Sequence, residues 1–281
     1  MQQPLLTSGL DPALVGQEAY DLATQLFPLP RSLTGDGVRQ TLNLLRDYIP
    51  IETREVATGT EVLDWTVPRE WRFRRGLLRH HDGRIIVDSA RSNLHVLGDS
   101  APVDTRRTLT ELRPHLFTLP DQPDLFPYRT SYYAENWGFC LPHKTLLALD
   151  EGPYDVLIDA EHVDGFMTYG ELLLPGSSGQ EILLTTHICH PSLANDNCSG
   201  LAVLTLLARA LLQRRRRHTY RILMAPGTLG ALAWLSAHDA DVSRITHGLV
   251  MSGLGDAGAP TYKRSRRGDA PIDRIMAYVL G

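Results

Sequence analysis

The sequence has few cysteines, little imbalance of charge and no long apolar run, and each shortage excludes a class of protein. Its 281 residues include three cysteines, an odd number that indicates a reducing compartment rather than secretion. Lys and Arg number 28 against 32 Asp and Glu, and the net charge of −4 argues against a nucleic-acid partner bound by bulk electrostatics. The four arginines 214–217 are best interpreted as the solvated end of a helix.

Two further shortages concern targeting. A stretch of about 18 uncharged apolar residues, which a membrane-spanning helix needs, does not occur in the sequence. The N-terminal segment has no basic flank followed by a long apolar run, so a secretory signal is not expected. We therefore expect a cytoplasmic protein without a membrane partner.

The residues that are present predict two structural parts. A hydrophobic fraction of 43% with 21% charged residues is typical of a chain with a buried core. Apolar spacing predicts amphipathic helices over residues 11–28 and 36–48. Short alternating or aromatic-rich runs from 52 to 135 predict a mainly β module. We therefore expect an α/β domain formed by residues 1–51 and 136–281, with a small β domain inserted at 52–135.

Strands and helices alternate in the last hundred residues. Apolar runs predict strands at 182–186, 220–225 and 248–251, with helices at 199–213 and 229–238 between them. This alternation favours an α/β fold with a parallel-rich sheet flanked by helices. Ligands of such sheets bind beyond the carboxyl ends of the strands. The residues that follow Thr186, Ala225 and Met251 are therefore the first candidates for a functional site.

A dense group of metal-competent side chains follows the first of these strands. The segment THICHPSLANDNCSG, residues 186–200, carries His187 at the strand end and Asp196 just before the next helix. Histidine nitrogen and aspartate oxygen are expected zinc ligands at a hydrolytic site, so His187 and Asp196 are the candidate ligands. In the alternative interpretation Asp196 or Asn197 caps the helix. We expect His190 to be an ordinary loop residue, and neither it nor Cys189 to be a direct ligand.

Several long motifs resemble an aminopeptidase-like family of bacterial proteins, the DUF4910/DUF2172 family, which is related to the M28 zinc aminopeptidases. The resemblance implies an α/β core of the phosphorylase/hydrolase type with a small β domain inserted near the N-terminus. It also implies one or two zinc ions that activate water, with His187 and Asp196 at the first two ligand positions. The motifs that carry it are RSLTGDGVRQTL at 31–42, DWTVPREW at 64–71, RTSYYAENWGFCL at 129–141, HICHPSLANDNCSG at 187–200 and APGTLGALAWL at 225–235.

The sequence departs from the M28 pattern at the positions that follow. The resemblance implies a pair of glutamates near Pro226 and Gly227, and no glutamate occurs after Glu181. The third strand end offers Ser252, with Asp256 four residues later. A dinuclear hydrolase needs a general base, most often a carboxylate. Two explanations stay open: a chain that is C-terminally incomplete, or a family that has drifted to a non-catalytic role.

The loop after the third strand end is basic. Arg264 and Arg266 are candidates for binding an anionic group of a substrate through guanidinium forks, and a solvated basic loop is the alternative interpretation. Three tryptophans at 65, 71 and 137 are expected to pack in the β runs.

The functional expectation is an aminopeptidase-like zinc metallohydrolase that cleaves a peptide or small amide substrate. One alternative is a binding or scaffold protein that serves polysaccharide or secondary-metabolite assembly. Another is an amidase or deacylase on a non-peptide substrate, such as an amino sugar. The sequence is compatible with an oligomer.

Overall fold

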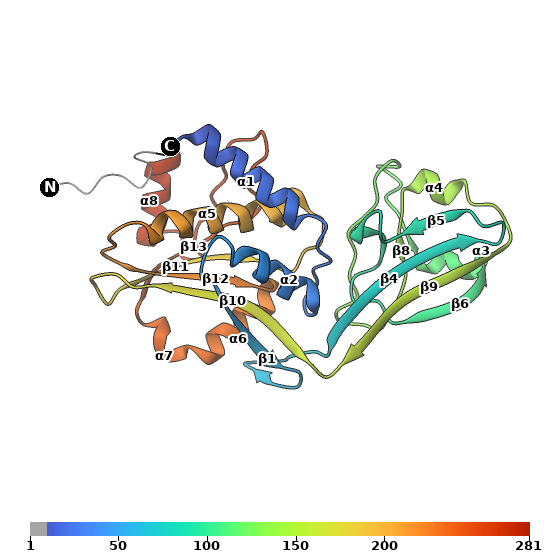
Figure 1. Cartoon of the computed structure of the whole chain (residues 1–281), viewed down its shortest axis with the longest axis horizontal. Coiled ribbons are helices and arrows are strands. Elements are labelled where there is room, and N and C mark those ends of the chain that lie inside the picture. The colour runs from blue at the N-terminus through green and yellow to red at the C-terminus, as the bar shows by residue number, and fades with distance from the viewer. Residues whose placement is uncertain (1–9) are drawn as a thin grey trace.

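The computed structural model describes residues 10–281, which form two lobes (Figure 1). The first nine residues of the predicted 1–51 segment lie outside the described part. A five-stranded sheet forms the centre of the main lobe, in the order β1-β10-β12-β11-β13. Its strands are β1 (Glu52–Ala57), β10 (Phe166–Leu174), β12 (Thr219–Ala225), β11 (Glu181–His187) and β13 (Ile245–Val250). Its helices are α1 (Pro12–Leu26), α2 (Asp36–Leu45), α5 (Gly200–Leu212), α6 (Gly227–Ala237), α7 (Asp239–Val242) and α8 (Pro271–Leu280).

The main sheet is only partly parallel, which corrects the prediction of a parallel-rich sheet. Strand β11 is parallel to β12 and β13, whereas β10 is antiparallel to both β12 and β1. A parallel crossover needs a connection of about a dozen residues or more. Because only residues 175–180 separate β10 from β11, the chain reverses there and β10 runs opposite to its neighbour β12. The broader prediction of a mixed α/β fold is confirmed.

Helices cover both faces of the sheet in the main lobe. Helices α1, α2 and α5 lie on one face and α6 on the other (Figure 1). Helix α5 presents Leu201, Leu204 and Leu211 to the largest apolar cluster, which also receives residues of α1 and α2. Trp234 of α6 is buried against the opposite face, beside Leu223. This packing fixes helix α5, whose N-terminal end directly follows the loop of residues 188–199 that carries Asp196.

The second lobe is built on a four-stranded antiparallel sheet in the order β5-β4-β9-β6. Its strands are β4 (Glu70–His80), β5 (Ile85–Asp88), β6 (Val103–Thr108) and β9 (Pro153–Val163). The short strands β7 (Leu116–Phe117) and β8 (Phe139–Cys140) and helices α3 (Leu109–Leu112) and α4 (His143–Leu147) complete the lobe. The buried residues at its centre include Trp71, Leu78, Phe139, Tyr154 and Ile158.

The predicted limits of the inserted domain, 52 and 135, do not separate the strands of the two sheets. Residues 52–57 form β1 of the main sheet, and the pair β2 (Glu61–Val62) and β3 (Trp65–Thr66) packs through Val62 against Ala233 of α6. Conversely, residues 153–163 belong to the sheet of the second lobe. Within residues 10–281, no helix has the length and apolar character needed to cross a membrane.

An ionic cluster holds the junction between the lobes. Glu70, at the start of β4, has a side chain only 1% exposed and accepts two hydrogen bonds from Arg39 of α2, at 2.9 and 2.8 Å. The backbone N–H of Phe166, at the start of β10, donates to the same carboxylate at 2.9 Å. Burial alone would raise the pKa of Glu70, but the bonds from Arg39 and Phe166 lower it to about 2.

Because its pKa is lowered on folding, Glu70 stabilises the native state above its unfolded pKa and loses this contribution in acid. We expect the difference in Tm between the wild type and Glu70→Gln to be largest above about pH 4.5 and to shrink toward pH 2. Thermal unfolding followed by circular dichroism at several pH values measures it. A difference that stays constant over this range would contradict the assignment.

Candidate metal centre

The candidate site lies in the loop between the carboxyl end of β11 and the start of α5. Ile188 continues the strand by donating its N–H to Ala225 at the end of β12. Asn197 donates to Thr186 Oγ1 at 2.6 Å and to the carbonyl of His187 at 2.9 Å. Thr186 in turn donates to the carbonyl of Met251, just after β13. The loop is therefore tied to all three strand ends that the sequence singled out.

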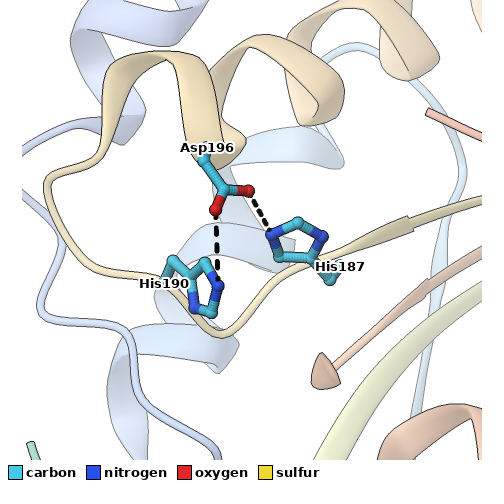
Figure 2. Close-up of side chains that lie close together, drawn as sticks. All are labelled: His187, His190 and Asp196. Carbon is cyan, nitrogen blue, oxygen red and sulfur yellow. Dashed lines mark ion pairs between the residues drawn. The ribbon is translucent and has the colours of Figure 1, made fainter. Parts of the chain in front are cut away.

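Three side chains of this loop converge (Figure 2). His187 Nε2 lies 2.8 Å from Asp196 Oδ1, and His190 Nε2 lies 3.7 Å from Asp196 Oδ2. One ligand atom of each residue lies within 4.8 Å of the other two. Ligands bound to zinc at about 2.0–2.2 Å in a tetrahedral arrangement lie roughly 3.3 Å apart, so the three residues are close enough for one ion to be shared after small movements of their side chains.

The hydrogen bonds of the site support this interpretation. His187 Nε2 is enclosed and makes no hydrogen bond, even though it lies close to the Asp196 carboxylate. A buried nitrogen without a hydrogen bond is costly. A metal ion held by His187, His190 and Asp196 would use this nitrogen, so the residues present fit a zinc ion.

The capping interpretation does not describe Asp196 and Asn197. Residue Ser199 is at the N-cap position of α5, and no side chain makes a capping hydrogen bond there. Asn197 points to Thr186 instead, and Asp196 points to the two histidines. Ser252, after the third strand, donates to Asp196 Oδ1 at 3.4 Å. Asp196 is thus oriented toward the shared point rather than toward the helix.

His190 lies in the cluster, contrary to the expectation of an ordinary loop residue. Its ring centroid lies 4.6 Å from that of His187, which precedes it by three residues. The spacing of the two histidines, three residues apart after a strand, is the signal that could have found it. Sequence reasoning gave more weight to the adjacent proline, which is typical of loops.

Cys189 lies beside this cluster, with its sulfur 3.6 Å from Nδ1 of His190. Its buried thiol accepts a hydrogen bond from the N–H of Gly227 at 3.2 Å. Burial raises the pKa of Cys189 to about 11, so the thiol is protonated at neutral pH. That Cys189 is not a ligand stays a prediction.

A cavity of about 500 Å³ opens beside the two histidines. Its other lining residues come from the ends of β11, β12 and β13 and from the first turns of α6, and their side chains are neutral and small. They are Thr185, Thr186, Ala225, Gly227, Thr228, Ala231 and Val250. The cavity therefore has room for a small substrate group next to the candidate ligands, at the place where open α/β sheets bind ligands.

The predicted substrate-binding arginines lie elsewhere. Arg264 and Arg266 are exposed and are not among the residues that line this cavity. Their loop folds onto α8, where Asp273 accepts hydrogen bonds from the backbone and side chain of Ser265 and from the N–H of Ala270. Their role in substrate binding stays a prediction.

Comparison with known proteins identifies the family and agrees with the fold. Residues 20–281 match the family model described as Domain of unknown function (DUF4910), and the chain belongs to this family. A relative from Clostridium acetobutylicum, named "Putative polysaccharide biosynthesis protein with aminopeptidase-like domain", is 46% identical over 265 residues. The alignment covers 94% of this chain and 61% of the relative, so the chain spans less than two thirds of that protein.

Solved structures of peptidases have a similar fold. The crystal structure of a "putative peptidase" from Clostridium acetobutylicum is 46% identical, with a TM-score of 0.94 over 95% of this chain and 64% of its own. A zinc aminopeptidase from Bacillus subtilis is 12% identical, with a TM-score of 0.60 over 95% of this chain and 78% of its own. A peptidase M28 precursor from Shewanella amazonensis has 13% identity and a TM-score of 0.57, covering 94% and 78%. The chain is therefore an aminopeptidase-like domain with the fold of the M28 aminopeptidases.

Proposed function

We propose that this chain is the zinc-binding part of an aminopeptidase-like hydrolase, with His187, His190 and Asp196 as the ligands it supplies. The observation that carries the proposal is the enclosed, unbonded Nε2 of His187 beside the Asp196 carboxylate. The fold of zinc aminopeptidases and the position of the cluster at the strand ends support it.

Each residue of the site has a defined part in this proposal. When bound, a zinc ion supplies Lewis-acid polarisation of an amide carbonyl and lowers the pKa of water. His187 would hold the ion from the strand end and His190 and Asp196 from the loop, and Asn197 fixes the backbone of His187. The cavity beside them accepts a neutral side group of the substrate. We infer that the substrate is a peptide or a small amide.

A second candidate function is metal-dependent binding without turnover. The observation that favours it is Gly227 in the cavity wall, which offers no side chain at one of the two positions, Pro226 and Gly227, near which the M28 resemblance implies glutamates. A third candidate is hydrolysis of a non-peptide amide. The name of the clostridial relative joins an aminopeptidase-like domain to polysaccharide biosynthesis, which makes an N-acyl amino sugar the appropriate test substrate.

Zinc titration of the chelator-treated chain tests the proposal. We expect one or two zinc ions per chain, and we expect zinc to restore cleavage of at least one substrate in a panel of short peptides, aminoacyl anilides and N-acyl amino sugars. A variant outside the site serves as the control for zinc bound by other histidines. His81→Ala removes an exposed histidine of the second lobe and should bind zinc as the wild type does. A wild-type chain that binds no zinc overturns the proposal, and zinc binding without any cleavage favours the second candidate.

A further inference from the structure

The metal loop is held by the second lobe as well as by its own strands. The hydroxyl of Tyr128, in a loop of the second lobe, lies 3.4 Å from Nδ1 of His190. The two rings contact each other edge to face, with their centroids 5.2 Å apart. His190 therefore has its Nε2 directed toward Asp196 and its Nδ1 directed toward Tyr128.

Two further contacts fix the backbone of the same loop. Arg31, buried in the main lobe, donates from Nε to the carbonyl of His190 at 2.9 Å. Asn93 of the second lobe donates to Ser192 Oγ at 3.0 Å and to the carbonyl of Pro28 at 2.8 Å. The second lobe thus reaches the loop at His190 and again two residues later.

We propose that Tyr128 is a positioning residue for the candidate metal centre: its hydroxyl accepts the Nδ1–H of His190 and leaves Nε2 with a free lone pair directed at the shared ion. This inference rests on the proposed function. It makes the second lobe a contributor to a site whose three candidate ligands all come from the main lobe.

The chemistry of imidazole explains why such a partner is needed. A neutral histidine carries its proton on one nitrogen only, and the hydrogen bond at the other nitrogen decides which one. Metal-bound histidines almost always donate their second N–H to an oxygen acceptor. Besides Tyr128, the Cys189 sulfur lies 3.6 Å from Nδ1, and sulfur is a weak acceptor.

The test compares Tyr128→Phe with the wild-type chain. The substitution keeps the ring and removes only the acceptor, and we expect zinc affinity to fall about 10- to 100-fold, as for other outer-shell changes. Competition with a chromophoric chelator measures the dissociation constant. The matched control is Tyr133→Phe, because Tyr133 is 85% exposed in the neighbouring segment and should bind zinc with wild-type affinity.

A second measurement separates positioning from folding and needs no metal. Nitrogen-15 NMR of the imidazole groups in the metal-free chain should show the proton of neutral His190 on Nδ1 in the wild type and redistributed to Nε2 in Tyr128→Phe. Asn93→Ala should also weaken zinc binding, since it frees the Ser192 end of the loop, but should leave the His190 tautomer unchanged. A purely structural effect of Tyr128 would not move the tautomer.

The outcomes of these tests are distinct. Wild-type zinc affinity in Tyr128→Phe overturns the positioning role, and so does an unchanged tautomer. If the wild type binds no zinc, the proposed function fails, and the tautomer measurement still decides whether Tyr128 orients His190.

Discussion

His187→Ala is expected to abolish zinc binding, together with any hydrolysis that depends on it. The side chain stands at the end of β11 and presents an enclosed Nε2 that makes no hydrogen bond and lies beside the Asp196 carboxylate. Its removal deletes a ligand rather than an outer-shell contact, so the loss of affinity should exceed the about 100-fold upper range of outer-shell changes. Isothermal titration with zinc measures the loss directly.

Asp196→Asn extends this prediction without changing the shape of the side chain. Asp196 contacts both histidines, and an amide lacks the negative charge that a zinc ligand supplies, so a loss comparable to that of His187→Ala is expected. His81→Ala again serves as the control. Stoichiometric zinc binding retained in both variants would show that the ion, if bound, lies elsewhere.

The largest effect on stability is expected for Arg221→Ala. Arg221 of β12 contacts Glu171 of β10 at 2.5 Å and Glu181 of β11 at 2.8 Å, and all three side chains are at most 8% exposed. Trp234 also donates to Glu171 at 2.9 Å. Removing the cation leaves two carboxylates buried without it, at a cost of about 3–5 kcal/mol. Urea unfolding of the variant and the wild type measures the difference in free energy.

Two comparisons make the Arg221 result specific. Arg74→Ala removes an arginine that also pairs with two carboxylates, Asp159 and Glu161, but on the exposed surface of the second lobe, and it should leave stability nearly unchanged. Combining Arg221→Met with Glu171→Gln and Glu181→Gln removes all three charges and should recover most of the lost stability. If Arg221→Ala unfolds like Arg74→Ala, the buried cluster does not stabilise the fold as argued.

Parts of the fold were predictable because the residues concerned are apolar almost throughout. Strands β11 and β12 and helix α5 lie close to their predicted ranges, since buried elements carry continuous apolar runs. The long strands β9 and β10 were not identified. In β9, charged residues such as Asp155 and Asp159 alternate with buried Val156 and Ile158, and the direction of β10 depends on pairing with strands distant in sequence.

The candidate site was predictable only in part. His187 and Asp196 flank a single loop, so their approach across it follows from the strand and helix on either side. The inclusion of His190 depends on how the loop turns, and the contact with Tyr128 depends on how a distant loop of the second lobe is placed. Arg264 and Arg266 follow a strand end as expected, but the hydrogen bonds to Asp273 hold their loop against α8.

The pairing of Glu70 with Val163, at the start of β4 and the end of β9, has a consequence for how this architecture varies. The chain departs for the second lobe and comes back at neighbouring positions, so the lobe is topologically a side branch of the main sheet. Its strands and loops can lengthen or shorten during evolution without shifting the register of β10 against β12. Replacement of the second lobe by another would change the residues around His190. The strands of the main lobe, which carries the candidate ligands, would stay the same.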